Sequence, residues 1–204
     1  MIAIIDYGVG NLFSLKSSFA AIGADVTVTS DPKVIAEADR LILPGVGAFE
    51  DAARKLRDSG LDEVIISEVK GGKHLLGICL GMQMLFDMSY EYGEHRGLGL
   101  ISGSVKPIRP EISEELKIPH IGWNAIKTVN ENPLTKGIDD GSCFYFVHSY
   151  MGMCEKPSQL YAVTEYGEDV TAIVGDGYVF GTQFHPEKSG EAGLHLLKNF
   201  VSLA

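Results

Sequence analysis

Four short apolar segments, each followed by a loop and then by a helical pattern, occupy the first half of the sequence. They cover residues 1–6, 24–29, 40–43 and 74–78. After the first of them, Leu12, Leu15 and Phe19 recur at helical spacing. This alternation is typical of a parallel sheet with helices on both faces. Because catalytic groups in such sheets gather at the carboxyl ends of the strands, the residues after each strand are the first candidates for a functional site.

The second half of the sequence contains short strand patterns and turns with little helical periodicity. Strands are predicted over residues 100–108, 122–129, 143–151, 160–166, 170–174 and 178–184. A hairpin turn at Gly175-Asp176-Gly177 joins the last two, and residues 190–202 have the pattern of a closing helix. We therefore expect one domain over residues 1–204. Its expected class is α/β, with a mixed, largely parallel, flavodoxin-like sheet flanked by helices and a β-rich second half.

Composition and charge exclude several classes of function. A net charge of −10 with no basic run argues against a nucleic-acid partner. No apolar run reaches the roughly 18 residues that a membrane span needs, and residues 1–6 lack the basic region of a signal peptide. Three cysteines without paired spacing fit a reducing compartment. We expect a cytoplasmic protein without a cofactor, and no cluster of ligands suggests a metal.

The segment Gly77-Ile78-Cys79-Leu80-Gly81 joins an apolar run to an amphipathic one. A cysteine between two glycines at such a junction is typical of a nucleophile elbow, where a strand turns sharply into a helix. The helix N-terminus would favour a thiolate at Cys79. The alternative is a buried, unreactive cysteine that only fills space.

A possible base for this nucleophile lies near the end of the chain, in Phe184-His185-Pro186-Glu187. Side chains two residues apart in an extended segment point the same way, so Glu187 can reach one imidazole nitrogen of His185. The other nitrogen is then free to take a proton from a thiol. Cys79, His185 and Glu187 would form a catalytic triad. The alternative is a core histidine that is hydrogen-bonded but not catalytic.

Two glycine-containing loops follow the first and third apolar segments. Gly8-Val9-Gly10 suggests a dinucleotide-binding loop, but Phe13 replaces the third glycine of that motif, so a plain turn is favoured. Pro44-Gly45-Val46-Gly47 can present backbone N–H groups to an anion. On its own, a tight strand–helix loop is the favoured interpretation.

The motifs together resemble those of the class I, or triad, glutamine amidotransferases. The class is marked by Gly77-x-Cys79-x-Gly81-x-Gln83 and by the late His185-Pro186-Glu187. Within the class, four segments resemble the glutaminase subunits of imidazole glycerol phosphate synthases. They are Ile5-Asp6-Tyr7-Gly8-Val9-Gly10-Asn11, Pro44-Gly45-Val46-Gly47, Pro119-His120-Ile121-Gly122-Trp123-Asn124 and Tyr145-Phe146-Val147-His148-Ser149-Tyr150. The resemblance covers essentially the whole chain.

The resemblance implies roles for further residues. Backbone groups of Val46, Gly47 and Leu80 would form the oxyanion hole of a cysteine-dependent hydrolysis of L-glutamine. Binding of glutamine itself is expected from Gln83, Glu91, Tyr145, His148, Ser149 and Tyr150. Glu91 has a plain alternative, because it lies in a loop rich in Tyr and Glu where a solvated carboxylate is common.

The resemblance also implies a partner, because the ammonia released from glutamine must be used before water protonates it. That partner is a cyclase subunit with a (β/α)₈ barrel, which would form a heterodimer with this chain. The interface is expected at Pro119, His120, Trp123 and Asn124. Aromatic residues are enriched at interfaces, although Trp123 could instead be a core residue.

Three other functions remain open at this point. The chain could be the glutaminase subunit of another ammonia-using synthase, an unrelated cysteine hydrolase such as a thioesterase or protease, or a silent binding module. An intact triad argues against the last of these.

Overall fold

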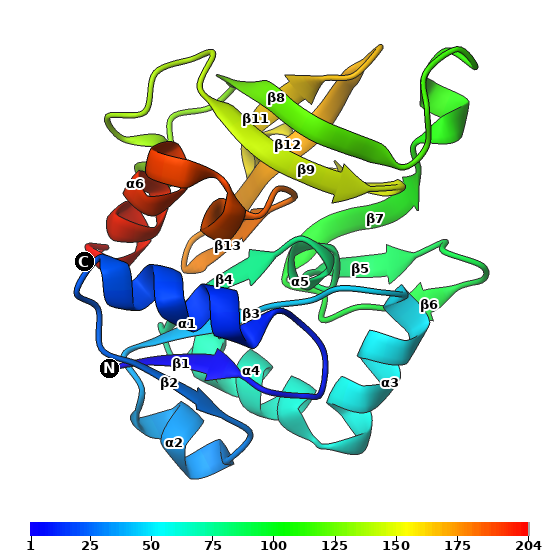
Figure 1. The fold of residues 1–204 in the computed structure, drawn as a ribbon. Helices are drawn as coiled ribbons and strands as arrows, with labels where there is room; N and C mark the ends of the chain where they lie inside the picture. Colours follow the sequence, from blue (N-terminus) through cyan, green and yellow to red (C-terminus); the bar gives the residue numbers. More distant parts are fainter. Residues whose placement is uncertain (204) are drawn as a thin grey trace.

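The computed structural model describes residues 1–203 and contains a large β-sheet, a smaller one and helices packed around them (Figure 1). The larger sheet has nine strands in the order β2-β1-β3-β4-β13-β12-β11-β8-β9. Their bounds are β1 Ile2–Ile5, β2 Val26–Thr29, β3 Arg40–Leu43, β4 His74–Ile78, β8 His120–Thr128, β9 Cys143–His148, β11 Leu160–Glu165, β12 Asp169–Asp176 and β13 Val179–Thr182.

The strands from β2 to β13 run parallel, and helices cover both faces of this part of the sheet. Successive side chains of a strand point to opposite faces, so Ile5 packs in one core and Ile4 in the other. Helices α2, α3 and α4 contribute to the first core, and α1 and α6 to the second (Figure 1). The helices are α1 Leu12–Ala21, α2 Pro32–Glu37, α3 Phe49–Asp58, α4 Leu61–Lys70, α5 Leu80–Gln83 and α6 Gly190–Val201.

The strands from β12 to β9 extend the sheet in antiparallel fashion. The predicted hairpin between β12 and β13 is present, with Asp176 paired to Val179. Strand β13 therefore joins the two halves, because it pairs parallel with β4 and antiparallel with β12. The predicted α/β class, with a mixed sheet and a β-rich second half, is confirmed.

The smaller sheet has the order β10-β7-β5-β6 and departs from the sequence prediction. Its strands are β5 Phe86–Ser89, β6 His95–Arg96, β7 Ile101–Pro107 and β10 Tyr150–Cys154. Strands β5 and β6 were not predicted. The single strand predicted over 143–151 is wrong, because β9 and β10 belong to different sheets. Apolar residues continue through both strands, so the sequence contains no signal for the change of sheet at Ser149.

The pairing of β4 with β13 brings distant parts of the chain together. Ile78 lies beside Thr182, and the Cys79 N–H donates to the Thr182 carbonyl over 2.7 Å. Cys79 and Gln183 therefore both follow the last paired residues at the carboxyl edge of the sheet. His185 lies two residues further on, at the same edge.

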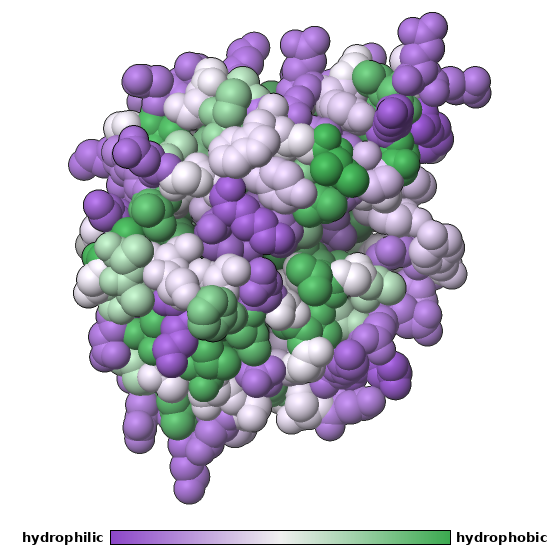
Figure 2. Space-filling view, in the orientation of Figure 1, coloured by the Kyte–Doolittle hydropathy of each residue, from purple (hydrophilic) through white to green (hydrophobic). Residues whose placement is uncertain are grey.

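Figure 2 shows one face of the molecule, on which hydrophilic side chains project from the rim and apolar ones gather toward the middle. The most exposed large apolar side chains of residues 1–203 include Phe13, Tyr92, Ile121 and Trp123. Within residues 1–203, no helix is both long and apolar enough to cross a membrane.

Candidate active site

Cys79 lies at a sharp turn between strand β4 and helix α5. Its backbone has φ 56° and ψ −113°, and a positive φ is uncommon for a residue with a side chain. Glycines on either side make this turn possible. A Cβ at Gly77 would lie 2.6 Å from the carbonyl oxygen of Gly81, and a Cβ at Gly81 would collide with the carbonyl oxygen of Leu43. The predicted strand–helix turn is therefore confirmed, and only glycine fits at these two positions.

The loop Pro44-Gly45-Val46-Gly47 packs directly on this turn. A Cβ at Gly45 would lie 2.7 Å from the backbone nitrogen of Gly81. On the other side of the loop, the Tyr7 hydroxyl donates to the Pro44 carbonyl over 2.7 Å. The loop and the Cys79 turn are thus in backbone contact, and Gly47, with φ +97°, adopts a conformation that favours glycine.

His185 and Glu187 follow strand β13 and lie next to Cys79. The His185 Nδ1 atom is 2.8 Å from Glu187 Oε1, and the side chain of Glu187 is only 1% exposed. Burial by itself would lower the pKa of His185. The neighbouring side chains of Cys79 and Glu187 outweigh it and raise that pKa to about 9. Among residues 1–203, the buried Glu187 Oε2 atom has no hydrogen-bond partner, so the carboxylate binds His185 through Oε1 alone.

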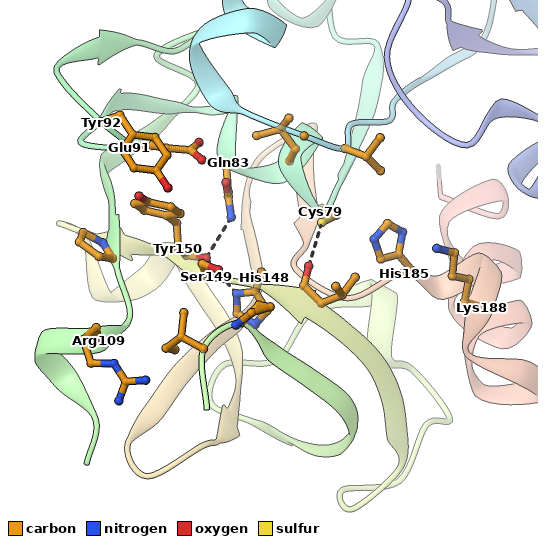
Figure 3. Close-up of a pocket in the computed structure, with 17 residues that line it drawn as sticks. Cys79, Gln83, Glu91, Tyr92, Arg109, His148, Ser149, Tyr150, His185 and Lys188 are labelled. Carbon is orange, nitrogen blue, oxygen red and sulfur yellow. Dashed lines mark hydrogen bonds between the residues drawn. The ribbon is translucent and has the colours of Figure 1, made fainter. Parts of the chain in front are cut away.

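Cys79 and His185, together with Val46 and Gly47, border a cavity of about 670 Å³ (Figure 3). One side, here called the catalytic wall, consists of Val46, Gly47, Cys79, Leu80 and His185. The other side, here called the β9–β10 wall, consists of Val147, His148, Ser149 and Tyr150, with Glu91 and Tyr92 beside them. The two walls meet where the Cys79 Sγ atom lies 4.0 Å from the Val147 carbonyl oxygen. A cavity of this size can hold an amino acid between a nucleophile and a polar wall.

Buried side chains hold the β9–β10 wall in place. The His148 Nδ1 atom is 2.9 Å from the Tyr150 carbonyl oxygen, and its Nε2 atom is 3.0 Å from His120 Nδ1. Burial lowers the pKa of His148 to about 3, so the ring is neutral at pH 7 and donates from Nδ1 to the carbonyl. His120 in turn contacts Asn124 Oδ1 over 2.9 Å and stacks on Phe146 and Tyr166.

Glu91 and Gln83 line the cavity, but each also has a partner within the protein (Figure 3). Glu91 Oε2 accepts from the Phe49 N–H over 2.7 Å, at the first residue of helix α3. The Gln83 side-chain amide donates to the Tyr150 carbonyl and to Gln183 Oε1, each over 3.0 Å. Glu91 is therefore not a freely solvated loop carboxylate, which was its alternative interpretation.

Most of the expected site residues line the cavity, and a few lie elsewhere. The ring of Tyr145 lies beside Trp123 and beneath Lys188, outside the residues that border the cavity. The Tyr145 carbonyl accepts from the His185 N–H over 3.0 Å, so it supports the catalytic wall from behind. Glu187 likewise lies behind His185.

The expected interface residues also divide into two groups. Pro119 borders the cavity, and the side chain of Trp123 is 56% exposed, so it is not a core residue. Asn124 is partly exposed and bound to His120. His120 departs from the expectation, because its side chain is completely buried and packs behind the β9–β10 wall. Alternation along β8 explains this, since His120 points into the protein whereas Ile121 and Trp123 are exposed.

Sequence reasoning missed four polar residues around the cavity. Tyr92, Arg109 and Lys188 border it, and Gln183 lies behind Cys79 with its Nε2 atom 3.8 Å from the sulfur. Lys188 and Gln183 flank the His185-Pro186-Glu187 motif, which is the only signal that could have pointed to them. Tyr92 and Arg109 reach the cavity through the smaller sheet, which was not predicted as such.

The other two cysteines lie away from the cavity. Cys143 is exposed on β9, and burial raises the pKa of the Cys154 thiol to about 12. Neither has an acid–base pair comparable to His185 and Glu187. Within residues 1–203, no group of three or more His, Cys, Asp or Glu side chains is arranged to hold a metal ion.

The chain matches the family profile of glutamine amidotransferase class-I over residues 3–203. Its fold is similar to that of a solved glutamine amidotransferase, with a TM-score of 0.74, 19% identity and coverage of 98% of this chain and 100% of that one. It is also similar to PurLQS from Thermotoga maritima, with a TM-score of 0.76, 19% identity and coverage of 98% and 96%. The chain therefore belongs to the class-I glutamine amidotransferase family.

Sequence relatives narrow this assignment. The chain is 47% identical over 203 residues to the imidazole glycerol phosphate synthase subunit HisH of Syntrophotalea carbinolica, and the match covers 98% of both chains. It is 48% identical over 202 residues to the HisH subunit of Sulfurimonas denitrificans, and this match covers 98% of this chain and 97% of that one. Within the family, this chain groups with the HisH subunits.

Proposed function

We propose that this chain is the glutaminase subunit of an imidazole glycerol phosphate synthase. It hydrolyses L-glutamine to L-glutamate and ammonia, and the ammonia passes to a cyclase subunit that makes imidazole glycerol phosphate and a carboxamide ribonucleotide in histidine biosynthesis. The observation that carries the proposal is the contact of His185 Nδ1 with Glu187 Oε1 at 2.8 Å, beside Cys79 at a shared cavity. The cytoplasm is the compartment that fits this role.

The three catalytic residues have distinct tasks in this proposal. His185 takes the proton from the Cys79 thiol through Nε2, because its Nδ1 atom is held by Glu187. The sulfur attacks the side-chain carboxamide of glutamine, and His185 returns the proton to the departing ammonia. Water then hydrolyses the thioester, and glutamate leaves. Glu187 orients the ring and stabilises its cationic form without taking the proton itself.

The tetrahedral intermediate carries an oxyanion that needs backbone donors. Val46, Gly47 and Leu80 border the cavity on the side of Cys79, and they are the residues that we assign to this task. One missing oxyanion donor costs about a hundred- to a thousandfold in rate. A glycine-flanked peptide can rotate easily, so we further propose that the 44–47 loop is completed as an oxyanion hole only when the cyclase subunit is bound.

The amino-acid end of glutamine would lie against the β9–β10 wall. Both hydrogens of the Gln83 amide nitrogen are already donated within the protein, so Gln83 can offer a ligand only its carbonyl oxygen. That oxygen and the carboxylate of Glu91 suit the ammonium group of glutamine. Backbone and hydroxyl groups of His148, Ser149 and Tyr150 complete this side of the site, whereas Tyr145 acts through His185.

The partner would bind around the mouth of the cavity. Trp123 and Ile121 are exposed there on β8, with Pro119 at the rim. Exposed aromatic and aliphatic side chains are frequent anchors of protein interfaces. We assign this surface to the cyclase subunit.

A reconstitution experiment tests the proposal. The chain is mixed with a cyclase subunit of an imidazole glycerol phosphate synthase, and product is measured with either glutamine or ammonium as the nitrogen source. Cys79→Ala should abolish the reaction with glutamine and preserve the reaction with ammonium, whereas Cys143→Ser should change neither. If the wild-type chain gives no glutamine-dependent product with the cyclase, the chain does not belong to an imidazole glycerol phosphate synthase, and the proposal fails.

A further inference from the structure

A chain of side-chain amides links the β9–β10 wall to the nucleophile. The Gln83 Nε2 atom donates to the Tyr150 carbonyl and to Gln183 Oε1, each over 3.0 Å. The Gln183 Nε2 atom lies 3.8 Å from Cys79 Sγ, within the range of an N–H···S hydrogen bond. Gln183 is completely buried and Gln83 is 5% exposed, so water does not compete for these contacts.

The donor–acceptor direction of this series of hydrogen bonds is fixed by its first acceptor, the Tyr150 carbonyl. A backbone carbonyl can only accept a hydrogen bond, so the Gln83 amide must present its NH₂ group to Tyr150. The second hydrogen of the same NH₂ group then points at Gln183, which must present its oxygen. Gln183 is left with its own NH₂ group facing Cys79. Each hydrogen bond therefore joins a donor to an acceptor. The last donor is the Gln183 NH₂ group, which faces the Cys79 sulfur.

A donor aimed at sulfur favours the thiolate over the thiol, because the charged form is the stronger acceptor. The other groups that face Cys79 act in different ways. The Val147 carbonyl, at 4.0 Å, favours the thiol as a donor. His185 accepts the thiol proton, and the hydroxyl of Tyr7 stays neutral because burial raises its pKa. Glu91 is tied to helix α3, and Lys188 borders the same cavity.

We propose that Gln183 is a further residue of the reaction site, which donates a hydrogen bond to the Cys79 sulfur and stabilises its thiolate. Gln83 is the positioning residue that holds the Gln183 amide in the required orientation. The inference rests on the proposed function, in which Cys79 is the nucleophile. When the thiolate forms, the thiol proton goes to His185 Nε2, and Gln183 keeps its own protons and only shares one with the sulfur.

The test is the pH dependence of Cys79 alkylation by iodoacetamide, followed by mass spectrometry of the Cys79 peptide in the full-length chain. Gln183→Met keeps the length of the side chain and removes its donor. The midpoint of the alkylation curve should rise by about one pH unit, because one pH unit corresponds to roughly one charge-assisted hydrogen bond. At pH values below both midpoints, the alkylation rate should fall by about tenfold. Gln83→Met should raise the midpoint by less.

Two further variants make the result decisive. Gln183→Glu is isosteric and keeps an acceptor for Gln83, but it places a carboxylate at the sulfur, so its midpoint should rise further than that of Gln183→Met. It also serves if Gln183→Met does not fold. Gln159→Met is the matched control, because Gln159 is a buried glutamine whose amide binds Ser102 and Asp176 instead. It should leave the midpoint unchanged.

Alkylation requires neither glutamine nor a partner, so the outcome is independent of whether the chain proves to be a glutaminase subunit. An unchanged midpoint in folded Gln183→Met or Gln183→Glu would overturn the inference. An equal rise in Gln159→Met would also overturn it, because the shift would then reflect general loosening of the fold.

Discussion

The catalytic wall of the cavity is fixed by its backbone, whereas the β9–β10 wall is held by buried side chains. At the first wall, Gly77 and Gly81 allow the Cys79 turn to pack against Leu43 and Gly45 with no room for a Cβ. At the second, the hydrogen bonds of His148 and His120 fix the position of the Tyr150 carbonyl. In the proposed function, the groups that form and break bonds therefore lie where the backbone is closely packed. The wall proposed to bind the substrate depends on contacts that single substitutions can remove one at a time.

The comparison predicts that changes on the catalytic wall act on kcat. His185→Asn should lower the glutaminase kcat by about 10⁴-fold, and Glu187→Gln by about 10²-fold, because Glu187 orients the base but transfers no proton. Steady-state glutaminase assays in the presence of the cyclase measure both. Near-wild-type rates in both variants would contradict a catalytic triad of Cys79, His185 and Glu187.

Gly81→Ala tests whether this wall is fixed by its backbone. The added methyl group would meet the Leu43 carbonyl oxygen, which cannot move without distorting β3. We expect a loss of about 4 kcal/mol or more in the free energy of unfolding, measured by urea denaturation. Gly177→Ala is the control, because Gly177 has φ +56° and no atom within 4 Å of the added Cβ. It should cost about 1 kcal/mol. Equal losses would contradict the packing explanation, because Gly81, unlike Gly177, has no positive φ that an alanine would strain.

The β9–β10 wall should make stability depend on pH. The folded protein holds His148 neutral because burial lowers its pKa to about 3, whereas the unfolded chain protonates it near pH 6.5. As pH falls from about 6.5 towards 3, the unfolded state binds a proton that the folded state does not. Stability should therefore fall by up to about 1.4 kcal/mol per pH unit from this residue.

Thermal or urea unfolding of His148→Asn across this pH window measures the effect. The asparagine keeps a donor for the Tyr150 carbonyl and removes the titration, so its stability should decline less steeply with acid than that of wild type. His195→Asn, on the exposed side of α6, is the control and should keep the wild-type slope. A slope unchanged by His148→Asn would contradict the assignment.

The smallest effect on catalysis is expected for His120, which packs behind His148. His120→Phe preserves the stacking on Phe146 and Tyr166 but removes the hydrogen bond to His148. One buried hydrogen bond corresponds to about 1–2 kcal/mol, so KM for glutamine should rise by about tenfold with little change in kcat. A fall in kcat at constant KM would mean that the two walls are not separate in function.

The difference between the two walls also explains which parts of the site could be predicted from the sequence. The catalytic wall is local: Cys79 lies between its glycines, and His185 and Glu187 are two residues apart, so short motifs identified them. The parallel half of the sheet was predictable for a similar reason, since each strand is followed by its own helix. These residues were predicted after strands of one sheet, and the structure places them after β4 and β13, which pair with each other.

The β9–β10 wall could not be derived in this way, because it is assembled from β9, β10 and the loop after β5, with β8 behind it. The hydrogen bond between His120 and His148 depends on the pairing of β8 with β9, where the two residues lie opposite each other. The change of sheet at Ser149, the short strands β5 and β6, and the buried position of Gln183 have no local signature. His120 was expected at the interface together with Pro119, Trp123 and Asn124 of the same motif, and only the alternation along β8 separates its buried side chain from the exposed Trp123.

The central claim is that Cys79 is the nucleophile that attacks glutamine. A diazoketone analogue of glutamine alkylates such a nucleophile, with loss of N₂, and leaves a stable thioether that peptide mass spectrometry can locate. In the complex with the cyclase, we predict one label per chain, on the Cys79 peptide, which is slowed by excess glutamine and absent in Cys79→Ala. Labelling of Cys143 or Cys154 instead, or labelling of Cys79 that glutamine does not slow, would contradict the account.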